Sequence, residues 1–174
     1  MTWLSRRHYW NNMAEKIRAG IGYDIHPLVP DRRLILGGIS IPSARGLEGW
    51  SDGDVLTHAI IEALLGAAAL GDIGWHFPAG DPRYKDISSL VMLGKVKDML
   101  TNKGWQIGNI DATVVTEEPK LKDYIDTMRQ TVGKTLDIEI EQISVKASTN
   151  NGLGTIGRNE GIAAYAVALI GTAK

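Results

Sequence analysis

One stretch of the chain, residues 49–66, combines an apolar helix pattern with three ionisable side chains. Its second half is apolar nearly all the way round, which is typical of a helix buried on most sides. Asp54, His58 and Glu62 recur every four residues and therefore line one side of that helix. Because ionisable groups are costly to bury without a partner or a metal, the stretch predicts a buried helix with a polar site beside it.

A second polar pair stands upstream, in the motif Gly-Tyr-Asp-Ile-His. Asp24 and His26 are two residues apart in a predicted strand, where alternate side chains share a face. With His58 they make one carboxylate and two imidazoles, a set that suits zinc with an open fourth position. Spacing alone leaves the alternative that His26 is a hydrogen-bonded strand-end residue and His58 a core histidine bonded to Asp54 or Glu62. Either acid would also suit the role of orienting a metal-bound His58.

Composition limits the chemistry further. The chain has no cysteine, so disulfides and thiolate-metal sites are excluded, and any transition metal must use His, Asp or Glu. A formal charge of -1 gives no basic surplus for nucleic acid. No apolar run approaches the roughly 20 residues that span a bilayer. We therefore expect a cytoplasmic protein without nucleic-acid or membrane partners.

The length of 174 residues suits one domain, residues 19–174, behind a non-catalytic N-terminal extension, residues 1–18. Strands and helices mix without strict alternation, which predicts a layered α+β fold. Loops are expected at 42–53 and 71–82. The expected strands are 16–28, 33–36, 39–41, 105–116, 142–148 and 160–170, the last covered on both faces, and the expected helices run from a cap at Ser51 or Asp52 to about Leu70, from Ser88 to about Asn102, and over 120–136.

Three glycine-containing segments are candidates for phosphate or sugar contacts. The start of the central helix, Ser-Asp-Gly-Asp (51–54), offers free N–H groups to an anion or simply caps the helix. Asp72 and Asp81 lie on a loop and suit either sugar hydroxyls or turns. Residues 152–157 match Gly-x-Gly-x-x-Gly, but the sequence that follows is too short for a dinucleotide-binding unit. A phosphate nest at 148–151 remains open.

Several long motifs stand in an order that is characteristic of one family. They are Gly-Tyr-Asp-Ile-His (22–26), Ser-Asp-Gly-Asp-Val-Leu-Thr-His-Ala (51–59), Leu-Leu-Gly-Ala-Ala-Ala-Leu-Gly-Asp-Ile-Gly (64–74), Phe-Pro (77–78), Glu-Pro-Lys (118–120), Val-Lys-Ala-Ser-Thr (145–149) and Gly-x-x-Gly-Arg-x-Glu-Gly (154–161). From about Arg18 to Ala173 the chain resembles the 2-C-methyl-D-erythritol 2,4-cyclodiphosphate synthase family of the non-mevalonate isoprenoid pathway.

The resemblance implies a homotrimer of ferredoxin-like α+β subunits with active sites between adjacent subunits. It implies Zn²⁺ on Asp24, His26 and His58, and a second divalent cation, Mg²⁺ or Mn²⁺. The implied substrate is 4-diphosphocytidyl-2-C-methyl-D-erythritol 2-phosphate, whose 2-phosphate attacks the β-phosphorus, closes a ring and expels CMP. A non-catalytic relative that binds a cytidine nucleotide or an isoprenoid diphosphate is the alternative.

The resemblance also assigns individual contacts. Asp72 and Gly74 would contact the ribose, the segment 116–122 the cytosine, and Ser148 and Thr149 the phosphates. Thr149 and Trp50 are the implied catalytic residues. The full set of implied substrate-binding residues is Asp24, His26, Trp50, Ser51, Asp72, Ile73, Gly74, Phe77, Asp81, Lys120, Ser148, Thr149, Asn150, Asn151 and Arg158.

The chain departs from the family pattern at two of these positions. Trp50 stands where the family usually has a phosphate-contacting His, and its indole can donate a hydrogen bond but cannot be cationic. Asn151 stands where a Glu commonly binds the second metal, so Mg²⁺ should bind more weakly unless phosphates supply most of its ligands. Arg158 would face an isoprenoid diphosphate in a central cavity, or else pair with Glu160.

Overall fold

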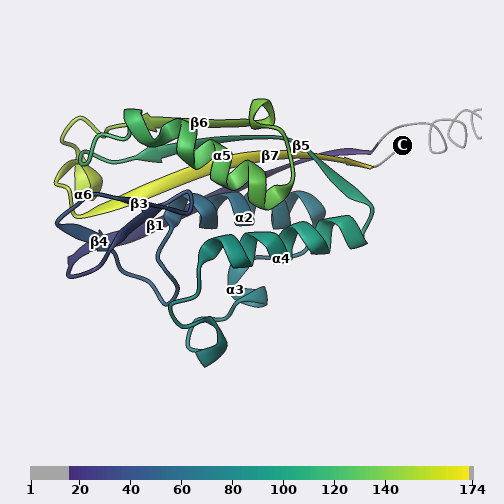
Figure 1. The fold of residues 1–174 in the computed structure, drawn as a ribbon, viewed down its shortest axis with the longest axis horizontal. Coiled ribbons are helices and arrows are strands. Elements are labelled where there is room, and N and C mark those ends of the chain that lie inside the picture. The colour runs from purple at the N-terminus through teal and green to yellow at the C-terminus, as the bar shows by residue number, and fades with distance from the viewer. Residues whose placement is uncertain (1–15, 173–174) are drawn as a thin grey trace, which may run out of the picture.

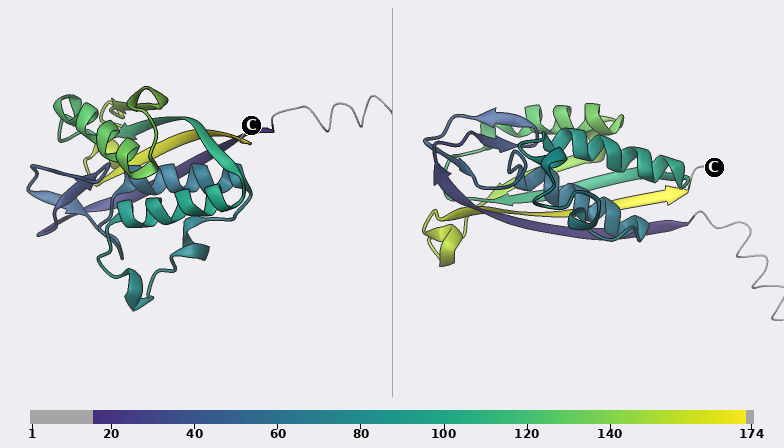
Figure 2. Two further views of the ribbon diagram at one scale, coloured as in Figure 1. Left: turned by 45° about the vertical axis from the view of Figure 1, so that its right-hand side comes forward. Right: turned by 90° about the horizontal axis from the view of Figure 1, so that it is seen from below.

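The computed structural model describes residues 16–172, whose centre is a mixed sheet with helices packed on one face (Figures 1 and 2). No helix among these residues is long and apolar enough to cross a membrane. Most of the expected N-terminal extension, residues 1–18, lies outside the described residues, although Ile17 already begins the first strand. The helices and strands, with the 3-10 turns marked η, are β1 Ile17–Pro30, β2 Leu34–Leu36, β3 Ile39–Ile41, β4 Arg45–Leu47, α2 Val55–Ala68, α3 Ile73–His76, η1 Pro82–Tyr84, α4 Ser89–Asn102, β5 Trp105–Val115, η2 Lys122–Tyr124, α5 Ile125–Leu136, η3 Ile140–Gln142, β6 Ile143–Ser148, α6 Gly154–Gly157 and β7 Gly161–Thr172.

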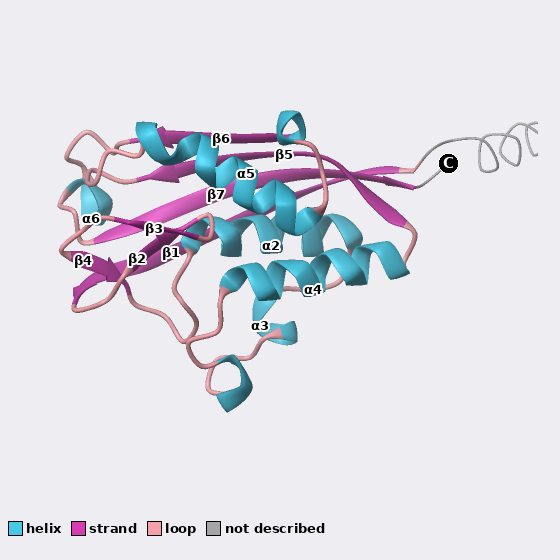
Figure 3. Cartoon of the chain, viewed as in Figure 1, coloured by secondary structure: helices cyan, strands magenta, loops and turns pink. Residues whose placement is uncertain are grey.

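The five-stranded sheet has the order β4-β1-β7-β5-β6 (Figure 3). Strands β5 and β6 are parallel and the other neighbours are antiparallel, so the sheet is mixed. A separate hairpin joins β2 to β3. This arrangement confirms the predicted α+β class.

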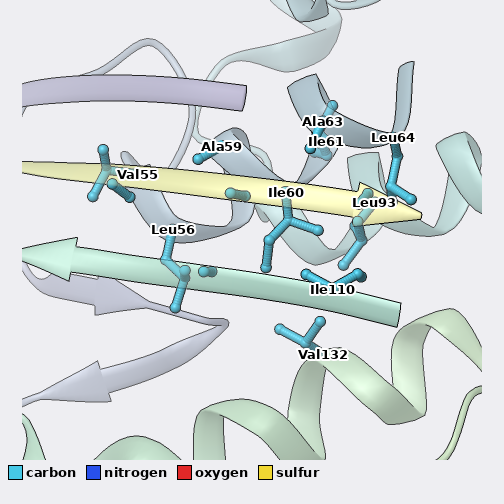
Figure 4. Close-up of a cluster of buried hydrophobic side chains, with 14 of the residues drawn as sticks. Val55, Leu56, Ala59, Ile60, Ile61, Ala63, Leu64, Leu93, Ile110 and Val132 are labelled. Carbon is cyan, nitrogen blue, oxygen red and sulfur yellow. The ribbon is translucent and has the colours of Figure 1, made fainter. Parts of the chain in front are cut away.

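Helix α2 packs directly on the backbone of β1. A Cβ atom added to Gly22 would lie 1.9 Å from the carbonyl oxygen of Ala59, and one added to Gly20 would lie 2.1 Å from that of Ala63. Two glycines on one face of the strand therefore permit a contact that any side chain would prevent. The predicted buried helix is confirmed, since its side chains fill the core together with Leu93, Ile110 and Val132 (Figure 4).

Several local predictions were wrong. The cap of α2 is Asp54, not Ser51 or Asp52, because its carboxylate accepts the N–H groups of Thr57, Gly37 and Gly38. The expected loops contain β4, α3 and the first residue of η1, and α5 begins at Ile125, directly after the 3-10 turn η2. Of these short elements, strand β4 depends on long-range pairing, as between its Leu47 and Leu28 in β1.

Strand β7 was expected to be covered on both faces, but one face is open in this chain. Its residues alternate between buried alanines and exposed side chains, with Tyr165 48% exposed and Val167 45% exposed. On the same face of β1, Ile21 is 74% exposed. The strand is apolar on both sides although the described chain covers only one of them.

Candidate metal centre and active site

The two predicted ligands on β1 and the one on α2 converge. The carboxylate oxygen Oδ2 of Asp24 lies 2.8 Å from Nδ1 of His58 and 2.9 Å from Nε2 of His26. The three ligand atoms all lie within 4.8 Å of one another, and they form the one such cluster within residues 16–172. The contact between Gly22 and Ala59 explains this convergence, because each residue lies one or two positions from a ligand.

The second nitrogen of each histidine has its own partner. Nδ1 of His26 bonds the carbonyl oxygen of Glu48. That oxygen can only accept, so Nδ1 carries a hydrogen, and Nε2 is the nitrogen that can give up its own hydrogen and bind a metal. Nε2 of His58 lies between two hydroxyls, 3.1 Å from that of Ser51 and 2.9 Å from that of Ser89.

Neither acid that was expected to orient His58 does so. Asp54 caps α2, as described above. Glu62 instead accepts the backbone N–H of Ile73 at 3.0 Å. Sequence reasoning missed Ser89 because it lies 31 residues from His58, and only the packing of α4 against α2 brings the two together. Glu48 contributes a backbone carbonyl, which no sequence pattern reveals.

The electrostatics of the cluster favour a cation. Burial alone would raise the pKa of Asp24, but hydrogen bonds to His26 and His58 outweigh it and hold this pKa below its usual range. Burial alone would lower the pKa of His26, whereas its hydrogen bond with Asp24 raises it. Both shifts show that the cluster gains from added positive charge. A carboxylate and two imidazoles around such a point are a donor set that fits a divalent metal ion.

A cavity of about 210 Å³ opens beside the cluster. Its lining includes Trp50, Ser51, Ile73, Gly74 and Phe77 together with the three ligands. The structure thus brings five further predicted substrate-binding residues to the metal cluster.

The loop beyond the cavity is held by specific contacts. Asp72 caps α3 by accepting the N–H of Trp75 at 2.8 Å. Asp81 is absent from the lining residues and forms an ion pair with Arg83, with the closest N–O distance 2.6 Å. The indole N–H of Trp50 donates to the carbonyl oxygen of Asp81 at 2.9 Å. This donor, expected to meet a phosphate, is therefore engaged with the loop.

Three of the remaining predicted residues line a second cavity, of about 470 Å³, at the ends of β5 and β6. Lys120, Ser148 and Thr149 line it. The neighbouring loop is fastened by Glu117, whose Oε1 accepts the N–H of Asn150 at 2.9 Å and of Gly152 at 3.3 Å. Glu117 belongs to the segment 116–122 expected at the cytosine, but sequence reasoning gave its carboxylate no role of its own.

At the same loop, Asn151 has a positive φ of 51°, and its amide oxygen accepts from the hydroxyl of Thr149 at 3.3 Å. Arg158 is paired with Glu160 within the chain, with Nε 2.7 Å from Oε1. That pair is the alternative that the sequence left open for Arg158.

The two cavities share no lining residue and lie on different strands. The register places Asp24 beside Ala164, Ala164 beside Val114, and Val114 beside Ala147. Three strand spacings separate the metal cluster from the Ser148 end of β6, which is about 14 Å.

Comparison with known proteins identifies the family. A family model described as the YgbB family matches residues 17–171. The chain belongs to this family. A 2-C-methyl-D-erythritol 2,4-cyclodiphosphate synthase of Thermosynechococcus vestitus is 60% identical over 155 residues, which are 89% of this chain and 96% of that protein.

Solved structures of relatives share the fold of this YgbB-family chain. IspF of Plasmodium falciparum in a CDP complex matches with a TM-score of 0.81 and 32% identity, over 92% of this chain and 99% of that chain. The bifunctional IspDF of Campylobacter jejuni matches with a TM-score of 0.89 and 38% identity, over 92% of this chain and 44% of that chain.

Proposed function

We propose that this YgbB-family enzyme, a lyase acting on a phosphorus–oxygen bond, cyclises 4-diphosphocytidyl-2-C-methyl-D-erythritol 2-phosphate. An oxygen of the 2-phosphate attacks the β-phosphorus, the bond from that phosphorus to the bridging oxygen breaks, and CMP leaves with the electron pair. The product is 2-C-methyl-D-erythritol 2,4-cyclodiphosphate. The observation that carries this conclusion is the convergent cluster of Asp24, His26 and His58 in a chain 60% identical to a synthase of that name.

Asp24, His26 and His58 would hold Zn²⁺ at this site, through Oδ2, Nε2 and Nδ1 respectively. When bound, it supplies Lewis-acid neutralisation of charge on a substrate phosphate oxygen. A second divalent cation, Mg²⁺ or Mn²⁺, would take most of its ligands from the phosphates, because Asn151 offers a neutral oxygen where a carboxylate would add charge. This agrees with the single three-ligand cluster found among residues 16–172.

The side chains position the substrate and need not transfer a proton. Nucleophile and electrophile belong to one molecule, and a phosphate oxygen is already anionic, so alignment supplies most of the rate. Ser148 and Thr149 hold the diphosphate, and the Thr149 hydroxyl donates to the charge that develops on the bridging oxygen. Asp72 and Gly74 hold the ribose, and the segment 116–122 with Lys120 surrounds the cytosine in the larger cavity.

The complete site forms between ferredoxin-like subunits of a homotrimer. Two features support this assembly: the separation of about 14 Å between the two half-sites of one chain, and the open apolar face of β1 and β7. Exposed apolar faces of this kind mark interaction surfaces. The expected isoprenoid diphosphate beside Arg158 stays a prediction, as do the cytoplasmic location and the roles of Asp81 and Asn150.

Release of CMP by the purified protein with Zn²⁺ and Mg²⁺ tests the activity. His58→Ala and Thr149→Ala should each be inactive while staying folded. If the site is shared, unfolding and refolding the two variants together restores about a quarter of the sites, because each rebuilt site takes one intact half from each variant. Absence of CMP release by the wild type would refute the activity. Active wild type with no recovery on mixing would refute the shared site alone.

A further inference from the structure

Ser89 occupies an unusual place, because a buried hydroxyl links a metal ligand to a carboxylate. It is the first residue of α4 and is fully buried, with an exposed fraction of 0%. Its Oγ lies 2.9 Å from Nε2 of His58 and also donates to Oδ1 of Asp52. The sequence gave Ser89 no function.

Asp52 is fixed in place by its other contacts. Its Oδ2 accepts the backbone N–H of Ser89 at 2.9 Å, and its Oδ1 accepts that of Asp54 at 3.2 Å. The backbone N–H of Asp52 donates to the carbonyl oxygen of Ile87 at 3.0 Å. The carboxylate is thus tied both to the turn before α2 and to the start of α4.

These contacts determine the direction of the hydrogen bond to His58. A carboxylate can only accept, so the single hydrogen of the Ser89 hydroxyl is used in the bond to Asp52. The Ser89 oxygen therefore meets His58 as an acceptor, and Nε2 of His58 must carry a hydrogen. Nδ1 is then the nitrogen that can give up the hydrogen it shares with Asp24 and bind a metal.

Ser51 is the other hydroxyl near His58, but it does not impose a direction. Its Oγ lies 3.1 Å from Nε2 and accepts the N–H of Gly53 at 3.4 Å. No carboxylate claims its hydrogen, so it can donate to His58 or accept from it. The choice between the two nitrogens of His58 therefore rests on Asp52 and Ser89.

We propose that Asp52 and Ser89 are positioning residues that hold the His58 ring with Nε2–H toward Ser89 and Nδ1 toward the metal. This inference rests on the metal role assigned above. Partners of this kind fix the tautomer and orientation of a ligating histidine, and their removal typically lowers metal affinity about 10- to 100-fold.

Zinc affinity measured by competition with a chelating dye tests the proposal without any assay of turnover. Ser89→Ala should bind Zn²⁺ about 10- to 100-fold more weakly than the wild type. Ser88→Ala is the matched control, because Ser88 caps the same helix by accepting the N–H of Leu90 at 3.3 Å and touches no ligand. It should lose some stability, because the cap is removed, and keep its zinc affinity.

Asp52→Asn provides a second variant of nearly the same shape. An amide can donate to Ser89, which frees the serine hydrogen to point at His58 and opposes the required tautomer. Its zinc affinity should fall, and the His58 Nε2–H signal in NMR spectra of the zinc form should lose its protection from solvent exchange.

Two outcomes are separable. A folded Ser89→Ala or Asp52→Asn protein with wild-type zinc affinity refutes the positioning role and leaves the proposed function standing. A wild-type protein that takes up no zinc refutes the metal site itself, and the inference falls with it.

Discussion

The contact between β1 and α2 predicts that a single methyl group at residue 22 disables the metal centre. In Gly22→Ala the new Cβ would lie 1.9 Å from the Ala59 carbonyl oxygen and 2.7 Å from the Ala63 nitrogen. Both obstacles are backbone atoms of a buried helix and cannot rotate away. Ordinary Cβ contacts begin near 3.4 Å, so α2 must retreat by about 1.5 Å or β1 must bend.

That displacement can be compared with the tolerance of the site. His58 is adjacent to Ala59, and Asp24 is two residues from Gly22, so the shift separates two ligands. Metal–ligand distances tolerate only about 0.2 Å. We expect Gly22→Ala to lose more than about tenfold in zinc affinity, or about 1.4 kcal/mol of binding free energy. Its free energy of unfolding should fall by about 3 kcal/mol, the upper end of the range for overpacking.

The assay is denaturant unfolding of the metal-free protein together with zinc competition against a chelating dye. Gly66→Ala is the control, because its Cβ would meet only the Ile21 carbonyl oxygen, at 3.8 Å. Alanine is the better helix former, so this variant should gain up to about 1 kcal/mol and keep its zinc affinity. A Gly22→Ala protein with wild-type stability and zinc affinity would show that the close approach does not set the site.

Three further predictions concern the metal and the two cavities. The pKa of His26 is raised in the folded chain, so protonation of His26 stabilises the metal-free fold at low pH. This stabilisation is lost as pH rises through the pKa of the folded state. Zinc, which needs the neutral ring, should therefore raise the melting temperature more at pH 8 than at pH 6; an equal shift would contradict this. Trp50→Phe keeps an aromatic ring but loses the indole hydrogen bond to the Asp81 carbonyl oxygen. KM should therefore rise about 2- to 10-fold with kcat little changed. An unaltered KM would show that this hydrogen bond does not hold the loop. Glu117→Ala should loosen the 149–152 loop, weaken CDP binding in calorimetry and lower the free energy of unfolding by about 1 kcal/mol. Glu117→Gln keeps an acceptor oxygen and should behave like the wild type. Identical behaviour of both variants would argue against the loop contact.

Much of the site was predictable from residue chemistry and spacing. Asp24 and His26 alternate on a strand and His58 lies on an apolar helix, so local periodicity placed each ligand on the correct face of its element. Their convergence was then confirmed at 2.8–2.9 Å. The start of α4 after Ser88 was also correct, because its serine cap is a local signal.

The failures share a physical cause. Asp54 rather than Ser51 or Asp52 caps α2, since the Gly37 and Gly38 N–H groups reach it from another part of the chain. Strand β7 has an open face although it is apolar on both sides. Whether a strand face is buried depends on which segments pack against it, and the composition of the strand alone does not predict that.

Side-chain identity and short-range periodicity were enough to predict the chemical types of the ligands, the central helix, the mixed α+β class and the family. Three features became known only from the folded chain: which groups orient the imidazoles, how far the metal cluster lies from the phosphate loop, and which sheet face is uncovered. Those features arise where segments tens of residues apart meet, at distances set by register and by the space that glycines leave. Such contacts have no signature within any one segment.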